Sequence, residues 1–300
     1  MSKKTSGGTV NTRRWDNIKL SFSVFFANTA AVVGLIIVLV YLADAFIMQI
    51  DPGLLGITYA NTLVPNFLNP VPTAPSWQHP FGTTYPGVDL YTSTLKAIRI
   101  DLFYSFLVVG VGAVVGSVIG VISAAIGGMM DEIVMRITDI FFSIPYLILA
   151  LAIGFILGRT LMNMSLTLAL VWWPIYARYT RSTTLSTKEF TFVEAARASG
   201  VSRIKIIFRH ILPNSLPPVF IQISLDLGAI MVIFSTLAFI GFITNASVPE
   251  LGYLTSLGLN YVQIAPWAVI FPGVVITIFA LAVNLLGDGL RDVIDPRRRS

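Results

Sequence analysis

The chain has 300 residues, 55% of them hydrophobic and only 12% charged, with a mean hydropathy of +0.79 and a formal net charge of +5. A water-soluble globule of this length cannot bury so much apolar surface, so the composition excludes a soluble domain and indicates a protein of the lipid bilayer. No cysteine is present, which excludes disulfides, cysteine-ligated zinc and thiol catalysis.

Six apolar segments are long enough, at about 17 residues or more, to cross a bilayer as helices. The third and fourth are separated only by residues 158–160, which predicts a tight hairpin. The first is too long for the apolar region of a signal peptide, so we expect it to be a retained membrane anchor. The sequence thus predicts an all-α membrane protein with six transmembrane helices, at 20–45, 102–126, 140–157, 161–177, 216–243 and 266–286.

The basic residues indicate which loops face the cytoplasm. Segments 47–95 and 241–265 contain neither Lys nor Arg, whereas all 20 basic residues except Lys96, Arg99 and Arg159 fall on the other side of the predicted spans. The positive-inside rule therefore predicts both termini in the cytoplasm. The net charge reflects this topology and does not indicate nucleic-acid binding.

Segment 47–95 is rich in Pro, Gly and Asn and has few periodic apolar residues. We expect it to be an irregular extracytoplasmic region. His79 lies within it and invites a metal-binding interpretation. A single histidine in a loop more often makes an ordinary hydrogen bond, and we favour that role.

Small residues recur every four positions along the second apolar segment. This spacing places them on one helix face, where the backbone of a neighbouring helix can approach closely. The pattern fits either the core of this chain or an interface between subunits, and the sequence does not choose. The residues are Gly112, Gly116, Gly120, Ala124 and Gly128.

Charged residues flank the central segments on the predicted cytoplasmic side. Arg136 and Asp139 are three residues apart in segment 130–145 and are expected to pair at the membrane edge, in a connection that could also contact a cytoplasmic partner. Arg178 and Arg181 lie near the inner end of the fourth segment, where their side chains can extend toward the membrane surface.

A polar, basic island, "FVEAARASGVSRIKIIFRHILPN" at 192–214, separates the fourth and fifth segments. Residues 188–199 are mostly good helix formers, and Gly200 stands where a left-handed residue ends a helix. Ser202 can cap a second helix that runs to about residue 211, where Pro213 helps to stop it. The island is predicted to be a helix, a glycine turn and a second helix. Each helix has an apolar face, formed by Phe192, Ala195, Ala196 and Ser199 and by Ile204, Ile207, Phe208 and Ile211.

Asp226 lies about eleven residues inside the fifth apolar segment. An ionised carboxylate at that depth costs several kcal/mol unless it faces water or a partner, roughly 3 kcal/mol on insertion scales. One interpretation places Asp226 on a translocation path. The other places it against Gln222 or a neighbouring helix as a polar packing contact.

Catalytic motifs are missing from the sequence. It contains no Walker A phosphate-binding loop, no G-x-S-x-G nucleophile motif and no HExxH zinc motif, and only two histidines. We therefore predict no catalytic, cofactor-binding or metal-binding residues and no enzymatic activity in this chain.

The spacing of six residues in the island, Glu194, Ala195, Ala196, Gly200, Leu212 and Pro213, resembles the EAA loop of ABC-importer permeases. The general family pattern has Ile two residues before the Leu-Pro pair, where this chain has His210, and the form "RHILPN" is similar to the peptide-importer branch. In such permeases this loop is the docking site of the ATPase. The resemblance therefore implies ATPase-coupling roles for Glu194, Ala195, Ala196, Gly200, His210, Leu212 and Pro213, and it outweighs the alternative of a basic loop that lies against lipid head groups.

The resemblance extends over about residues 79–297. "HPFGTTYPGVDLYTSTL", "MDEIVMRITDIFFSIP" and "NLLGDGLRDVIDPR" are similar to segments of the C-type permease subunits of the dipeptide, oligopeptide and nickel class. Val88 departs from the pattern, since the family usually has Arg there. Glu250 and Leu251 depart where the family commonly carries Trp before Gly252. These departures leave the function of the outer loops open.

The resemblance implies a type I ABC-importer permease fold in the cell membrane. Residues 1–78 would form the N-terminal tail, first span and outer loop, and residues 79–300 the permease core with five spans and the cytoplasmic coupling loop 186–214. The implied partners are a homologous B-type permease, two cytoplasmic ATPase subunits that bind ATP and Mg²⁺, an extracytoplasmic substrate-binding protein and membrane lipid, but no nucleic acid.

The implied activity is ATP-driven import of peptides by alternating access. Oligosaccharides or nickel complexes are the alternative cargo within the same class. A proton-coupled secondary transporter that uses Asp226 is an alternative of a different class, although the chain shows no inverted repeat. A membrane scaffold without transport activity is a third possibility.

Overall fold

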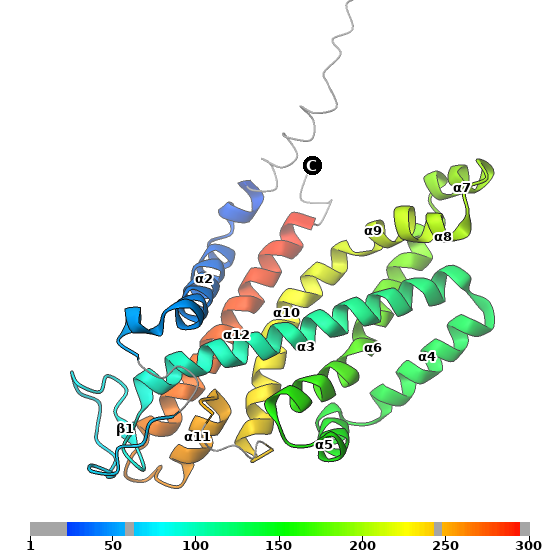
Figure 1. Cartoon of the computed structure of the whole chain (residues 1–300). Coiled ribbons are helices and arrows are strands. Elements are labelled where there is room, and N and C mark those ends of the chain that lie inside the picture. Colours follow the sequence, from blue (N-terminus) through cyan, green and yellow to red (C-terminus); the bar gives the residue numbers. More distant parts are fainter. Residues whose placement is uncertain (1–22, 58–62, 243–247, 295–300) are drawn as a thin grey trace, which may run out of the picture.

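The computed structural model describes residues 23–57, 63–242 and 248–294. Helices dominate this part of the chain (Figure 1), and the paired strands in it are two short ones at the base of α3. The elements are α2 (Thr29–Ile50), η1 (Pro52–Leu55), β1 (Thr83–Thr84), β2 (Val88–Asp89), α3 (Leu90–Ile126), α4 (Gly128–Ser143), α5 (Tyr146–Leu157), α6 (Leu161–Thr187), α7 (Thr191–Ala198), α8 (Arg203–Ile206), the π-helix η2 (Ile207–Ile211), α9 (Leu212–Ser215), α10 (Pro217–Phe239), α11 (Leu251–Leu259) and α12 (Trp267–Ile294).

Four of the described helices, α2, α3, α10 and α12, are long and apolar enough to cross a membrane. The predicted third span is broken, because α4 and α5 meet at an angle of 95° beside Pro145, and this pair counts as a fifth span only if it is taken as one. The predicted fourth span lies in the first part of α6, whose remainder is polar. The described residues therefore contain four candidate spans, or five if α4 and α5 form one, and the predicted number of six is not confirmed. The hairpin at 158–160 is confirmed, since α5 ends at Leu157 and α6 begins at Leu161.

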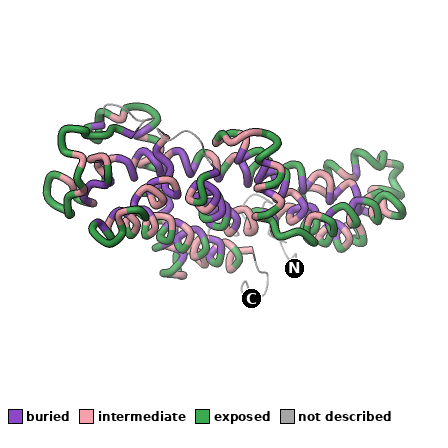
Figure 2. Tube along the Cα trace, turned by 90° about the horizontal axis from the view of Figure 1, so that it is seen from below, coloured by how far each residue is buried: buried purple, intermediate pink, exposed green. Residues whose placement is uncertain are grey.

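The two ends of the molecule carry different elements. Figure 1 shows α7, α8, the start of α2 and the end of α12 together at one end, which we call the α7 end, and β1 and α11 at the other, the α11 end. The long helix α3 packs against α6, α10 and α2 between them. The buried residues lie where these helices face one another, and the exposed ones cover the outward faces (Figure 2).

The repeated small residues of α3 pack inside this chain. A Cβ atom added at Gly116 would lie 2.2 Å from the carbonyl oxygen of Trp173, and one at Gly120 would lie 2.2 Å from that of Ala177, so the backbones of α3 and α6 touch. Of the two roles that the sequence allowed, the core of this chain or an interface between subunits, these two glycines belong to the core. Gly128 does not belong to the stripe, because α3 ends at Ile126 and Gly128 has a φ of +60°.

The segment between α2 and α3 is mostly irregular, as predicted, with the short 3₁₀ helix η1 at its start. Strands β1 and β2 pair Thr83 with Asp89 in antiparallel register. The Nδ1 atom of His79 lies 2.5 Å from the Oδ2 atom of Asp89, whose Oδ1 accepts from the backbone N–H of Thr92 at 2.7 Å and so caps α3. The hydrogen-bonding role predicted for His79 is confirmed.

Candidate functional site

The polar island folds as the predicted helix, turn and helix at the α7 end. Helix α7 precedes Gly200, which has the left-handed φ of +75° that a side chain with Cβ disfavours, and α8 follows. The first helix begins at Thr191, not at residue 188, because Lys188 still ends α6. Ser202 stands at the N-cap position of α8, but its side chain makes no capping hydrogen bond.

The second half of the island continues without interruption into the core. Helix α8 passes into the π-helix η2, which contains His210, and then into α9 and α10. Pro213 does not stop the helical run as expected, since it lies in the first turn of α9, directly after the π-helix. The His210 carbonyl accepts a hydrogen bond from the Asn214 side-chain amide at 2.6 Å. π-Helical turns often occur at functional sites.

Apolar side chains fasten the island to the end of α3. Val193 of α7 is fully buried and forms one cluster with Ile206, Ile211 and Val121 of α3, against which Ala196 and Leu212 are half-buried. The island is therefore packed against α3 through this cluster and connected to α10 through η2 and α9.

The island also exposes apolar side chains. Phe192, Ile204 and Phe208 are 40%, 72% and 49% exposed. Four basic residues of the island are exposed as well, together with Glu194, Ala195 and Pro213. Exposed aromatic and aliphatic side chains combined with arginines are typical of a protein docking site. The basic residues are Arg197, Arg203, Lys205 and Arg209.

Ion pairs join α4 to α6 beside the island. The guanidinium of Arg181 donates from Nε and Nη2 to the two carboxylate oxygens of Asp131 at 2.7 and 2.6 Å, and the Ser123 hydroxyl donates to the same carboxylate at 2.7 Å. Arg178 pairs with Asp139 and lies 4.2 Å from the ring centre of Phe142.

One sequence-based expectation about these charges is wrong. Arg136 does not pair with Asp139 but lies 3.9 Å from Glu132, because Asp139 faces Arg178 across the gap between α4 and α6. The spacing in the sequence revealed only partners on the same helix.

We expect Arg181→Ala to lower the free energy of unfolding by about 3 kcal/mol, since it leaves the largely buried Asp131 carboxylate unpaired. Asp131→Ala should cost a similar amount. Thermal unfolding of the two single variants and the double variant in detergent forms a double-mutant cycle. Additive losses would contradict the pairing, and Glu132→Ala, at an exposed pair, is the control with a loss of about 0.5 kcal/mol or less.

Asp226 is buried, with an exposed fraction of 3%, between α10 and α6. Its Oδ1 accepts a hydrogen bond from the Gln222 amide at 2.8 Å, and the Tyr176 hydroxyl and Trp172 indole face the carboxylate. Gln222 is therefore the hydrogen-bond partner that a role of Asp226 in helix packing requires. A role on the translocation path is not tested by this contact.

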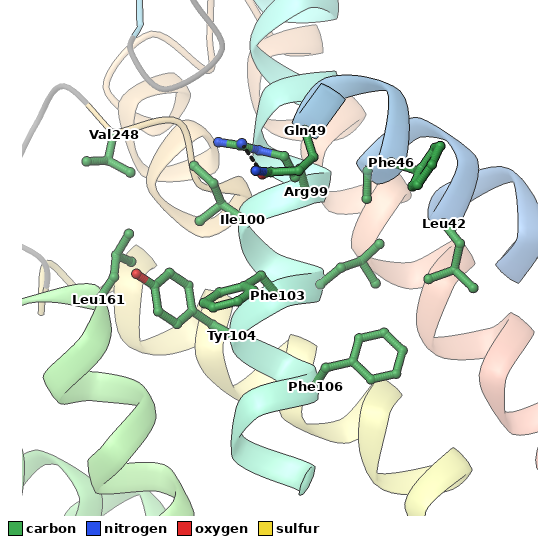
Figure 3. A pocket seen from close by; sticks show the side chains of 12 residues that line it. Leu42, Phe46, Gln49, Arg99, Ile100, Phe103, Tyr104, Phe106, Leu161 and Val248 are labelled. Carbon is green, nitrogen blue, oxygen red and sulfur yellow. Dashed lines mark hydrogen bonds between the residues drawn. The ribbon is translucent and has the colours of Figure 1, made fainter. Parts of the chain in front are cut away.

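A large open pocket lies elsewhere, on the side of the molecule formed by α2 and α3. Figure 3 shows Leu42, Phe46, Phe103 and Phe106 around it, with Gln49 and Arg99 hydrogen-bonded at 2.8 Å near one edge. Its volume is about 860 Å³, and its lining is mainly apolar. The lining includes none of the residues that the sequence singled out for coupling or for the translocation path.

Comparisons with known proteins place these features in a family. The model of the family described as "Binding-protein-dependent transport system inner membrane component" matches residues 116–300. The chain is 37% identical over 280 residues to the dipeptide transport system permease protein DppC of Alkalihalophilus pseudofirmus, which covers 93% of this chain and 90% of that protein.

Two further relatives and one solved structure agree. The chain is 37% identical to the probable D,D-dipeptide transport system permease protein DdpC of Escherichia coli, covering 90% of this chain and 87% of that protein. It is 34% identical to the oligopeptide transport system permease protein OppC of Haemophilus influenzae, covering 92% and 87%. A chain of the MetNI methionine ABC transporter in an inward-facing conformation superposes with a TM-score of 0.55 and 21% identity, covering 68% of this chain and 97% of that one.

The solved structure shows that the fold is that of a chain of an ABC transporter. The family match spans the island, α10 and α12, and the curated relatives extend the similarity to nine-tenths of the chain. This protein is a multi-pass membrane permease that belongs to the binding-protein-dependent transport system inner membrane component family.

Proposed function

We propose that this chain is the C-type permease subunit of an ATP-driven importer of peptides. The observation that supports this function best is the island itself, which exposes apolar and basic side chains, packs against α3 and leads into α10. It provides both a place for an ATPase to dock and a connection to the membrane helices.

The topology that goes with this function has six crossings and both termini in the cytoplasm. The bent pair α4 and α5 would supply the third crossing and α6 the fourth. The α7 end, which holds the island, the start of α2 and the end of α12, is then cytoplasmic. The distribution of Lys and Arg supports this orientation.

Coupling requires that the ATPase bind the island differently in its two nucleotide states. Closure of the ATPase subunits would move α7 and α8, and the contacts with Val121 and the continuous backbone into α10 would re-aim both spans. The central path would thus open outward and then inward. Glu194, Gly200 and Pro213 are our candidates for the coupling contacts, with ATP and Mg²⁺ held in the partner ATPase subunits.

Peptides are the proposed cargo because the relatives are named as dipeptide and oligopeptide permeases. Oligosaccharides or nickel complexes remain the alternative cargo in this class. The proposed assembly contains a homologous B-type permease, two ATPase subunits and an extracytoplasmic binding protein, which would deliver the peptide.

The test is reconstitution of the full chain with these partners in liposomes. We expect uptake of a labelled dipeptide or oligopeptide that requires ATP and the binding protein and that continues when an ionophore collapses the proton gradient. Uptake that needs the proton gradient and not ATP would instead establish the secondary-transporter alternative. Failure of the ATPase subunits to co-purify with the chain would contradict the proposed docking.

We expect Asp226→Asn to lower transport about tenfold with normal expression if the carboxylate faces the path, equivalent to about 1.4 kcal/mol in the transport barrier. The measurement is ATP-dependent uptake in the reconstituted system. Ser224→Ala, on another face of α10, is the control and should transport normally. Unchanged transport by Asp226→Asn would assign the carboxylate to packing against Gln222 alone.

A further inference from the structure

Three helices meet closely near the α11 end of the molecule. Helix α11, which the sequence did not predict, lies against α10 so tightly that a Cβ atom added at Gly252 would be 1.9 Å from the Ser235 carbonyl oxygen. The backbone N–H of Leu251, the first residue of α11, donates to the Asp101 carboxylate of α3 at 3.1 Å. The start of α11 is thus clamped between α3 and α10.

Two carboxylates are buried at this junction. Asp101 and Glu250 both have exposed fractions of 0%. Glu250 caps α11, because its Oε2 atom accepts from the Tyr253 N–H at 2.6 Å, and it interacts electrostatically with Asp101. The Ser235 hydroxyl, which is also buried, is directed at the Glu250 carboxylate.

One oxygen of each acid has no hydrogen-bond partner within the described part of the chain. These atoms are Oδ1 of Asp101 and Oε1 of Glu250, and the Ser235 hydroxyl is likewise without a partner. Two adjacent carboxylates that are out of contact with water cannot both ionise, because desolvation and repulsion add. The junction therefore needs one positive charge between the two acids.

Among the described residues, no basic side chain acts on the pair. The groups that act on it are the N–H groups of Leu251, Gly252 and Tyr253 and the Ser235 hydroxyl, and none of them is Lys, Arg or His. Burial raises the pKa of Glu250, in keeping with a carboxyl group that keeps its proton.

We propose that Asp101 and Glu250 hold one proton between their unpartnered oxygens, and that this O–H···O bond latches α11 to α3. The proton comes from solvent and returns to it, so nothing is oxidised or reduced. The groups that face the pair are hydrogen-bond donors from α10 and α11, namely the Ser235 hydroxyl and the N–H groups of Leu251, Gly252 and Tyr253. This site is independent of the peptide-transport function.

The direction of the pH effect follows from the burial. The latched state holds the proton more tightly than an open state in which water reaches both acids. Closure is therefore favoured at low pH and weakens as the pH rises from the ordinary carboxyl range, about 4, toward the raised pKa of the closed pair. Above that pKa the second acid loses its proton and repulsion separates α11 from α3.

The absence of cysteine allows a direct test with the full chain in membranes. Leu254→Cys places a thiol at a fully buried position of α11, and Leu259→Cys places one at an exposed position of the same helix. The ratio of their labelling rates with a maleimide cancels the pH dependence of the reagent. We expect the ratio of buried to exposed labelling to rise with pH, by at most about tenfold per pH unit for one proton, and then to level off.

Asp101→Asn and Glu250→Gln should each make this ratio independent of pH, while Asp44→Asn, at a buried acid of α2, should leave the rise unchanged. A flat ratio in the parent, a rise that survives both substitutions or a slope steeper than one proton would overturn the proposal. Infrared difference spectra of the parent against Asp101→Asn provide a second measurement. They should contain a protonated carboxyl C=O band at neutral pH, and its absence would also overturn the latch.

Discussion

Gly200→Val should abolish most ATP-coupled transport, by more than about tenfold, while the protein still inserts in the membrane. Gly200 has a φ of +75°, and a left-handed conformation costs a β-branched residue about 1–2 kcal/mol or more. A Cβ atom there would meet nothing within 4 Å, so the substitution changes only the backbone turn between α7 and α8. The expected result is ATP hydrolysis that continues without transport, measured in the reconstituted system.

The matched variant is Gly200→Asn. Asparagine tolerates the left-handed region far better than valine, so it should retain a large part of the transport activity. Full transport by Gly200→Val would show that the turn geometry does not matter for coupling. Equal losses in the two variants would assign the defect to the added side chain and not to the backbone.

Gly120→Val should prevent stable folding, with the free energy of unfolding lowered by about 3 kcal/mol or more. Even the Cβ atom would lie 2.2 Å from the Ala177 carbonyl oxygen and 2.3 Å from the Thr180 hydroxyl, and neither can move without separating α3 from α6. The measurement is the yield of monodisperse protein and its thermal unfolding midpoint in detergent.

Gly110→Val is the control for this effect. Gly110 lies on the same helix, but a Cβ atom there meets nothing within 4 Å. Gly110→Val is therefore the same replacement of glycine by valine without the steric overlap with α6. Comparable yields of the two variants would mean that the close approach of α3 and α6 is not required for folding.

Local sequence signals predicted the elements well where a single physical requirement decides them. The four long apolar helices follow from the need to satisfy backbone groups within a bilayer, and Gly200 follows from the conformational freedom of glycine. Their ends were less accurate. Helix α3 begins at Leu90 and not at 102, because Asp89 caps it from a loop that the hydropathy pattern excluded.

That error in the start of α3 also concealed the carboxyl pair. With the span placed from residue 102, Asp101 fell in a loop, where a carboxylate needs no explanation. The contact of Asp101 with Leu251 and the ion pair of Asp131 with Arg181 could not be found for a related reason, since each joins helices that are far apart in sequence. Likewise, Pro145 was visible in the sequence, but the 95° bend beside it depends on how α4 packs against α6.

The single continuous helix α3 connects the island to the two buried acids. Val121, which contacts the island, and Asp101 are separated by about 30 Å along this 37-residue helix, at about 1.5 Å per residue. A tilt of about 5° pivoted halfway moves each point by about 1.3 Å in opposite directions. That displacement would stretch the 3.1 Å contact between Asp101 and Leu251 beyond hydrogen-bonding distance. A small tilt of α3 at the island is thus mechanically sufficient to break a hydrogen bond at the α11 end of the molecule.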